Sequence, residues 1–409
     1  MKIKDIGTVV TGKTPQTSHA EYYGGKYMFV TPTELHGGYK VSHAEKTITE
    51  EGLNSIKSNT IDGTSVLVGC IGWDMGNVAM CFDKCASNQQ INSITNISED
   101  YNPFYLYYWL CTKKEYLFSI ASVTRTPILS KGVFEEIEIP EIKREDQDKV
   151  ADVLLAIDKK IEANTAINDN LQQQIKLLYD YWFSQFDFPN AEGLPFKSSG
   201  GEMEYSDRLK RNIPLGWTVE SVIDNTISTP IKPGVEVFDK KTYLATADVN
   251  GTTISSGSLI DYENREGRAN MQPSVSSVWF AKMKNSIKHL YLNKQMQPII
   301  DSTILSTGFC GLQCLEQSFE YMAAFIEHSY FESVKDVLAH GATQESVNND
   351  DLLGLVMVVP NKDVLDLFHR RTAPMYAQIS KNICENQQLT KLRGWLLPML
   401  MNGQAIVGD

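Results

Sequence analysis

The sequence predicts an α+β fold built as a tandem repeat, in which two β-rich domains are each followed by a long helix. Apolar residues from about Glu145 to Phe183 recur at alternating four- and three-residue steps, the spacing of a helix with a coiled-coil seam. The same spacing returns 218 residues later, from Phe368 to Leu400, after a second β-rich segment. A duplicated unit of this kind predicts pseudo-two-fold symmetry.

Both seams contain two asparagines at matching positions, Asn164 and Asn168 in the first helix and Asn382 and Asn386 in the second. A buried Asn costs stability unless it meets a polar partner, so the matched pairs predict that the two helices pack on each other in one register. Two unrelated amphipathic helices are the alternative, because the segments share little other identity. Pro374 is expected to kink the second helix or delay its start.

In chain order, the pattern divides into a first β-rich domain, a central long helix, a linker rich in Pro, Gly and Ser, a second β-rich domain and a distal long helix: residues 1–142, 143–186, 187–215, 216–360 and 361–409. The expected strands are rich in β-branched and aromatic residues and include Tyr27–Val30, Ser65–Ile71, Val78–Phe82, Lys241–Ala247, Val278–Ala281 and Ile299–Leu305. Each domain ends in an apolar strand closed by a proline, Pro140 or Pro360.

Bulk composition is that of an ordinary globular chain, with 409 residues of which 42% are hydrophobic and 22% charged. Neither a signal peptide nor a membrane-spanning run is apparent, so a cytoplasmic location is expected. The seven cysteines lack Cys-x-x-Cys spacing, and no metal site is predicted. A net charge of −12 argues against indiscriminate nucleic-acid binding, so any DNA function must depend on local patches or on partners.

The motifs of common enzymes are absent or lack the required context. Gly7 to Thr14 matches the phosphate-loop pattern, but Pro15 blocks the helix that should follow it and only six residues precede it. Asn102-Pro103-Phe104 is better explained as a turn before a helix than as a methyltransferase site. No catalytic residues are predicted.

Segments that combine cations, amides and aromatic residues are candidates for contacts with phosphates and base edges. They comprise Lys282, Lys284, Asn285 and Lys288, an upstream group of Arg265, Arg268 and Asn270, and an amide run of Asn88, Gln89, Gln90 and Asn92. For the amide run, ordinary turn residues are the competing explanation.

Several stretches together resemble the specificity subunit of Type I restriction-modification enzymes over essentially the full chain. They include Gly12-Lys13-Thr14-Pro15, Cys70-Ile71-Gly72-Trp73-Asp74-Met75-Gly76, Leu177-Leu178-Tyr179-Asp180-Tyr181-Trp182-Phe183, Ile213-Pro214-Leu215-Gly216-Trp217, Gly341-Ala342-Thr343-Gln344 and Leu396-Leu397-Pro398. The first half departs from the second in lacking a Gly-Trp opening and in having Thr124-Arg125-Thr126 in place of Gly-x-Thr-Gln.

The resemblance implies that each β-rich domain is a target recognition domain for half of a bipartite DNA site, and that the helices form an antiparallel coiled coil. It also implies two modification subunits that methylate adenine with S-adenosylmethionine, and motor-nuclease subunits that use ATP and Mg²⁺, while this chain binds no cofactor itself. Further candidate DNA contacts follow from the resembling stretches: Lys13, Thr14, Trp73, Thr124, Arg125, Thr343 and Gln344. A fused nuclease or methyltransferase and a non-DNA coiled-coil adaptor are the alternatives.

Overall fold

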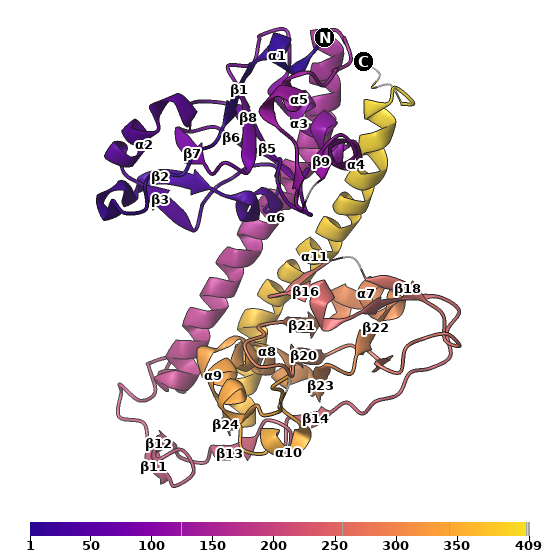
Figure 1. Cartoon of the computed structure of the whole chain (residues 1–409). Helices are drawn as coiled ribbons and strands as arrows, with labels where there is room; N and C mark the ends of the chain where they lie inside the picture. Colours follow the sequence, from indigo (N-terminus) through magenta and orange to yellow (C-terminus); the bar gives the residue numbers. More distant parts are fainter. Residues whose placement is uncertain (124, 256, 343, 406, 408–409) are drawn as a thin grey trace. The chain divides into compact units, whose positions relative to one another are not determined.

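The computed structural model describes residues 1–123, 125–255, 257–342, 344–405 and 407. The chain divides into two compact units: unit 1 comprises Met1–Glu162 with Gln388–Asp409, and unit 2 comprises Ala163–Gln387. Each unit therefore contains one β-rich domain and part of both long helices (Figure 1). This division differs from the predicted one, which gives each helix a segment of its own.

Domain 1 contains two four-stranded sheets. The first has the order β1-β8-β5-β6, formed by Thr8–Thr11, Ile91–Thr95, Ser65–Gly69 and Val78–Cys81. The second has the order β3-β2-β7-β4, formed by Lys46–Ile48, Tyr23–Val30, Cys85–Ser87 and Thr60–Ile61. Helices α3 (Pro103–Cys111) and α4 (Lys114–Ser119) follow the sheets. The Asn102 side chain accepts hydrogen bonds from Phe104 N–H and Tyr105 N–H, which confirms the predicted turn at the start of α3.

The two four-stranded sheets of domain 2 repeat this topology strand for strand. Its first sheet has the order β14-β23-β20-β21, formed by Ser228–Pro230, Phe309–Cys314, Ser277–Ala281 and His289–Leu292. Its second sheet has the order β18-β15-β22-β19, formed by Ser258–Ile260, Lys241–Leu244, Thr303–Ser306 and Ala269–Met271. The pair β15–β22 is parallel, as is its counterpart β2–β7. Helices α8 (Phe319–Glu327) and α9 (Ser329–Leu338) follow, so the predicted tandem repeat is confirmed.

Shorter elements complete the two units: α1 Ile3–Ile6, α2 Glu50–Ser55, β9 Ser122–Val123, β10 Pro127–Ile128, α5 Lys131–Glu135, β11 Met203–Ser206, β12 Arg211–Pro214, β13 Thr218–Ser221, β16 Val249–Asn250, β17 Thr253–Ile254, α7 Gln297–Ser302, α10 Asn349–Leu352 and β24 Val356–Val359. No helix among the described residues is both long and apolar enough to cross a bilayer.

The long helices are α6 (Arg144–Tyr179), continued by a π-helical turn over Asp180–Ser184, and α11 (Lys362–Met401). Of the two effects expected of Pro374, a kink or a delayed start of the second helix, the delay is not found. Helix α11 begins twelve residues before this proline and runs through it. A proline inside a helix removes one backbone hydrogen bond. Packing of the helix against the rest of the chain stabilises it by more than this loss.

The seam asparagines of unit 2 contact one another. Asn164 Nδ2 donates to Asn386 Oδ1 at 2.9 Å, and Asn382 Nδ2 donates to Asn168 Oδ1 at 2.8 Å. Because ascending residues of α6 meet descending residues of α11, the two helices are antiparallel. Unit 1 continues the same pairing with a different chemistry, since Asp158 pairs with Arg393 and accepts a hydrogen bond from Tyr108 Oη at 2.6 Å.

Both units have a core that joins the domain to its share of the helices. In unit 1, Leu400 and Met401 of α11 and Leu154 of α6 belong to the core cluster of the first sheet. In unit 2, Trp182 and Phe183 pack with Phe368, with ring centroids 5.6 Å and 5.0 Å from it. Burial of these aromatic side chains fixes the helices to domain 2.

Two local predictions differ from the structure. The strand expected over Ile299–Leu305 begins only at Thr303, because Pro298 lies in the first turn of α7 and Ile299 and Ile300 are buried by that helix. The segment 187–215, predicted as a linker, contains the β11–β12 hairpin, and Phe188 stacks on Trp217 at 4.9 Å. The strand over Ile299–Leu305 was predicted too long because an apolar run of this length fits a helix as well as a strand.

Candidate nucleic-acid interface

The shared topology places the candidate residues of both domains at equivalent positions. In domain 1 the hairpin loop between β5 and β6 spans residues 70–77, and in domain 2 the hairpin loop between β20 and β21 spans residues 282–288. A second segment lies against each loop: Gly72 N–H donates to Pro127 O at 3.0 Å, and Lys284 N–H donates to Glu345 O at 3.0 Å. These contacts place Trp73 and Arg125 at one edge of domain 1. They place Lys284 and Gln344 at the equivalent edge of domain 2.

In domain 1 the amide run closes a turn beside its hairpin loop. Asn88 Nδ2 donates to Gln90 Oε1 at 2.9 Å, and Gln90 O accepts from Cys70 N–H at 2.7 Å. Thr14 Oγ1 donates to the exposed Gln89 at 3.0 Å, and Lys13 beside it is exposed. The structure therefore brings four predicted segments to one edge of domain 1: Lys13 with Thr14, the hairpin loop 70–77, the amide run from Asn88 to Gln90, and the segment that contains Arg125.

Gly12 has a structural role at this edge. A Cβ atom at residue 12 would lie 2.1 Å from Asn88 O, so the chain approaches too closely for any larger residue. The segment that matches the phosphate-loop pattern contains strand β1 where a phosphate-binding loop would be, which agrees with its rejection as a nucleotide site.

Trp73 is the most prominent side chain of the domain 1 hairpin loop, with 71% of its surface exposed. Its neighbour Asp74 lies 2.7 Å from Lys114 Nζ and 3.2 Å from His36 Nε2. The hydrogen bond from Lys114 lowers the pKa of the Asp74 carboxyl, so this carboxylate is ionised at neutral pH. Asn77 Oδ1 accepts a further hydrogen bond from Lys114 at 2.8 Å. Hydrogen bonds from Lys114 therefore fix the base of the loop, while the Trp73 indole remains exposed to solvent.

The domain 2 hairpin loop contains lysines that already have partners. Lys284 forms an ion pair with Glu345 at 2.9 Å, and Lys288 Nζ donates to Thr246 O at 2.5 Å. Lys282 is half-buried, and its backbone N–H donates to Gly308 O at 3.0 Å. Asn285 is exposed with a positive φ of 53°, which a short polar side chain tolerates.

The upstream group of domain 2 is divided in its exposure. Arg268 is exposed, and its carbonyl accepts from Thr307 N–H at 2.9 Å. Asn270 is half-buried. Arg265 lies over the Tyr262 ring at 3.9 Å and donates to Tyr262 O, so its guanidinium is held within its own turn.

The remaining candidates have different positions. Asn92 is only 2% exposed, with Oδ1 accepting from Thr11 Oγ1 at 2.7 Å, so we correct its assignment and leave it out of the interface. The hydrogen bond of this buried side chain lies within domain 1, as is usual for buried polar groups. Arg125 and Gln344 are exposed. Thr124 and Thr343 lie outside the described residues.

A buried charged network beneath the domain 2 hairpin loop was not predicted from the sequence. His289 is 1% exposed, with Nδ1 3.2 Å from Glu327 Oε2 and Nε2 2.8 Å from Glu332 Oε1. Burial disfavours the imidazolium, but both carboxylates outweigh this effect and raise the pKa of His289. Charges at such separations along the chain carry no periodic signal in the sequence.

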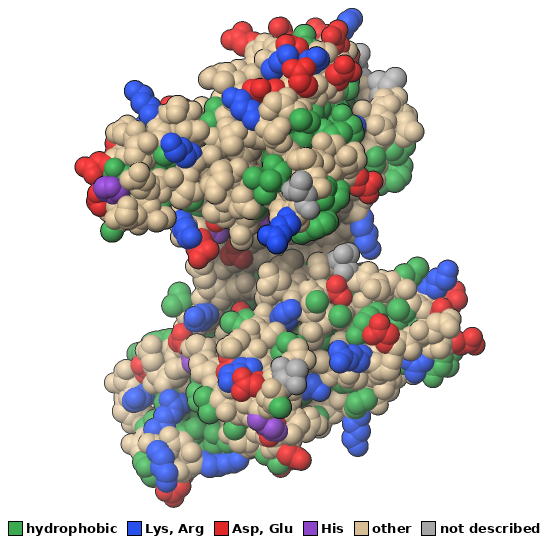
Figure 2. Space-filling model, in the orientation of Figure 1, with side chains coloured by type: hydrophobic (Ala, Val, Ile, Leu, Met, Phe, Trp, Pro, Cys, Tyr) green, Lys and Arg blue, Asp and Glu red, His purple; other side chains and the backbone are tan. Residues whose placement is uncertain are grey.

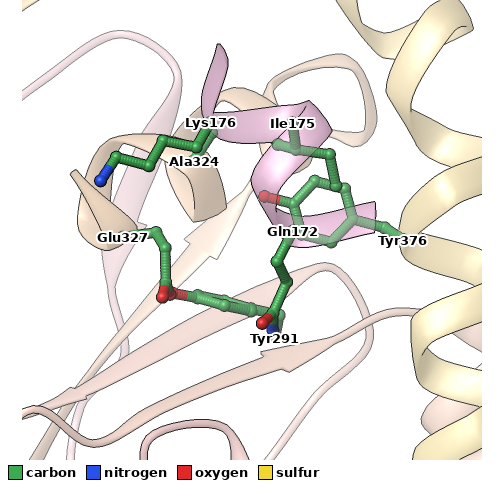
Figure 3. A pocket seen from close by; sticks show the side chains of 7 residues that line it. All are labelled: Gln172, Ile175, Lys176, Tyr291, Ala324, Glu327 and Tyr376. Atoms are coloured by element: carbon green, nitrogen blue, oxygen red, sulfur yellow. The ribbon is translucent and has the colours of Figure 1, made fainter. Parts of the chain in front are cut away.

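Glu327 also lines a small cavity beside α6, together with Gln172, Lys176, Tyr291 and Tyr376. Figure 3 shows the Glu327 carboxylate meeting the Tyr291 hydroxyl, while the Lys176 amine points away from both. The space accommodates about one water molecule, which suits a structural site rather than a ligand.

Charge is mixed on the face of each unit that Figure 2 shows. On the face drawn in Figure 2, Lys and Arg side chains are interspersed with Asp and Glu over both units. Such a surface gives a weaker attraction to phosphates than a continuous basic patch, in keeping with the net charge of −12.

Comparisons with known proteins give one consistent result. A family model described as the Type I restriction modification DNA specificity domain matches residues 1–173. The chain is 28% identical over 434 residues to the Type I restriction enzyme MjaIX specificity subunit of Methanocaldococcus jannaschii, covering 100% of this chain and 93% of that protein. It is 22% identical over 330 residues to the Type I restriction enzyme HindI specificity subunit of Haemophilus influenzae, covering 66% of this chain and 68% of that protein.

Among solved structures, the S subunit of a Type I restriction-modification system from M. genitalium aligns with a TM-score of 0.56 at 15% identity. The alignment covers 98% of this chain and 95% of that one, and it supports the same fold.

Proposed function

We propose that this chain is a specificity subunit of the Type I restriction-modification family and that it recognises a DNA site in two parts, one read by each domain. Specificity subunits are the DNA-recognition components of these systems and are not themselves catalytic. The chain is accordingly not an enzyme. Its two domains serve as the target recognition domains.

The observation that carries this proposal is the identical strand order of the two domains, with different residues on equivalent loops. Where domain 1 presents Trp73 beside Asp74, domain 2 presents Lys284 and Asn285. Two domains with the same backbone fold but different loop side chains suit two half-sites of different sequence. Base edges are contacted by side chains, whereas the shared strands only position them.

Partner subunits would supply the chemistry and much of the phosphate binding. Two modification subunits would carry S-adenosylmethionine, and motor-nuclease subunits would carry ATP and Mg²⁺. The repeat supports two copies of one partner: Leu177 of α6 and Trp395 of α11 are equivalent by the 218-residue offset, and they are 69% and 60% exposed.

The test is selection of binding sites by the complex of this chain with its modification partners, using duplexes randomised over about 25 base pairs. We expect a motif of two specified parts separated by unspecified positions. The methylated motif of cells that carry the system should match it. A single uninterrupted motif, or no preference at all, would refute the proposal.

The isolated chain provides the accompanying control. Freed of partners, it should neither transfer methyl groups from S-adenosylmethionine nor cut DNA in the presence of Mg²⁺. Activity that copurifies with the chain through rigorous fractionation would contradict its assignment as a recognition component.

A further inference from the structure

A buried lysine occupies the centre of the domain 2 hairpin loop. Lys335 of α9 has a side chain with 0% exposure, and its Nζ donates to Ala281 O at 3.3 Å and to Ser286 O at 3.1 Å. Ala281 ends β20 and Ser286 lies within the loop, so one ammonium group joins the start of the loop to its far side. Glu332 Oε2, 2.5 Å away, balances the charge of this ammonium.

Helix α9 makes a second contact with the same loop. Asp336 Oδ1 accepts from Asn285 N–H at 3.0 Å, at the residue whose φ is positive. The conformation of the loop is therefore set by α9 from below, while the side chain of Asn285 stays exposed.

Domain 1 has a corresponding contact from the equivalent helix. Lys114 of α4 donates to Asp74 Oδ1 at 2.7 Å and to Asn77 Oδ1 at 2.8 Å, which again joins two points of one hairpin loop. A Cβ at Gly76 would lie 2.8 Å from Lys114 Cγ, so the lysine stem packs directly on the loop backbone. The two domains use different acceptors, backbone carbonyls in one and side chains in the other.

We propose that Lys114 and Lys335 are positioning residues, each of which holds the hairpin loop of its own domain in the conformation that discriminates bases. Neither ammonium group needs to touch DNA for this role, since each has its hydrogen bonds within the protein. A loop held within a fraction of an ångström keeps its exposed side chains aligned with base edges, whereas a loose loop accepts several bases. The inference rests on the function proposed above.

The experiment compares the wild-type complex with complexes that contain Lys114→Met or Lys335→Met. Methionine keeps most of the length and the apolar stem but cannot donate hydrogen bonds. Each complex is used to select sites from duplexes in which one half-site at a time is randomised, and affinity is measured against salt concentration. We expect Lys114→Met to lower base discrimination roughly fivefold or more at one half-site, and Lys335→Met to do so at the other.

The salt dependence separates positioning from phosphate binding. Loss of a phosphate contact would reduce the slope of log affinity against log salt by about 0.9, whereas a positioning residue leaves the slope unchanged. Lys114→Arg is the matched control, because it keeps a cation that can reach Asp74 and should restore discrimination. A reduced slope with intact discrimination would overturn the inference for that lysine.

Lys335→Met removes the lysine partner of the buried Glu332 and leaves it with His289 at Oε1, so this variant can fail to fold for that reason alone. The double variant Lys335→Met/Glu332→Gln removes both charges and should fold, with faster amide hydrogen exchange in residues 282–288 and relaxed discrimination at the same half-site. If the wild-type complex reads two half-sites and the folded variants discriminate bases equally well, the inference is refuted but the proposed function is not. A wild-type complex without a two-part preference would refute the proposed function and this inference together.

Discussion

Lengthening both long helices by one heptad should lengthen the gap between the half-sites. The insertion points must face each other in the antiparallel pair, where Asp158 meets Arg393 and Asn164 meets Asn386. Seven residues are therefore added between Glu162 and Ala163 and between Gln387 and Gln388. Points related by the 218-residue repeat, such as Leu171 and Leu389, do not face each other and would break the register.

The size of the effect follows from helix geometry. Seven residues add ~10 Å at ~1.5 Å per residue, which corresponds to about three base pairs at ~3.4 Å each. Helix phase changes by only ~20° per heptad, whereas three base pairs turn the duplex by roughly 100°. The preferred gap should increase by about three base pairs, with weakened binding because the second half-site is rotated.

Three heptads in each helix should act differently. They add ~32 Å, close to one turn of DNA, so the second half-site returns to nearly the same face and affinity should recover relative to the single-heptad variant. Methylome sequencing of cells that carry each variant measures the gap, and an insertion in α6 alone is the control that should disrupt assembly. An unchanged gap in a folded double insertion that binds its partners would refute the idea that the helices act as a spacer.

The remaining predictions concern the domain 2 loop, its buried network and the helix seam. Replacing the three lysines of residues 282–288 by Ala should reduce the salt slope of DNA binding by up to about 2.7 if all three meet phosphates, and an unaltered slope would place them in protein contacts only. Because the pKa of His289 is raised above 6.5, its stabilising contribution is complete below pH 6.5 and is lost as pH rises through the folded-state pKa; thermal melts should show this loss, and His289→Gln should abolish it. Asn382→Leu should cost ~1–3 kcal/mol in urea unfolding because it removes the donor to Asn168 Oδ1, and the double variant Asn168→Leu/Asn382→Leu should be more stable than the single one, which additive effects would contradict.

The sequence predicted the architecture well because periodicity survives duplication. The seam positions of both helices could be read directly, and the matched asparagines indicated that the helices meet. The direction of the pair came from the family resemblance, since a heptad seam fits either direction.

Individual contacts were harder to predict. Asn92 belongs to an amide run that suits base recognition, yet it lies on a strand whose side chains are buried, and the pattern of polar residues does not distinguish the two cases. Lys335 was not singled out in the sequence, and its ammonium contacts a loop more than forty residues away in the chain. Burial of a charge depends on long-range acceptors, which only the folded chain brings together.

The division of the chain into units has a consequence for synthesis. All residues of unit 2 have been made once residue 387 leaves the ribosome, whereas unit 1 still lacks the α11 segment that contains Leu400 and Met401. Until that segment emerges, the core around Leu154 of α6 lacks the side chains that α11 contributes. The domain translated first therefore reaches its native core last, and the nascent chain must carry exposed hydrophobic surface through the synthesis of more than two hundred intervening residues.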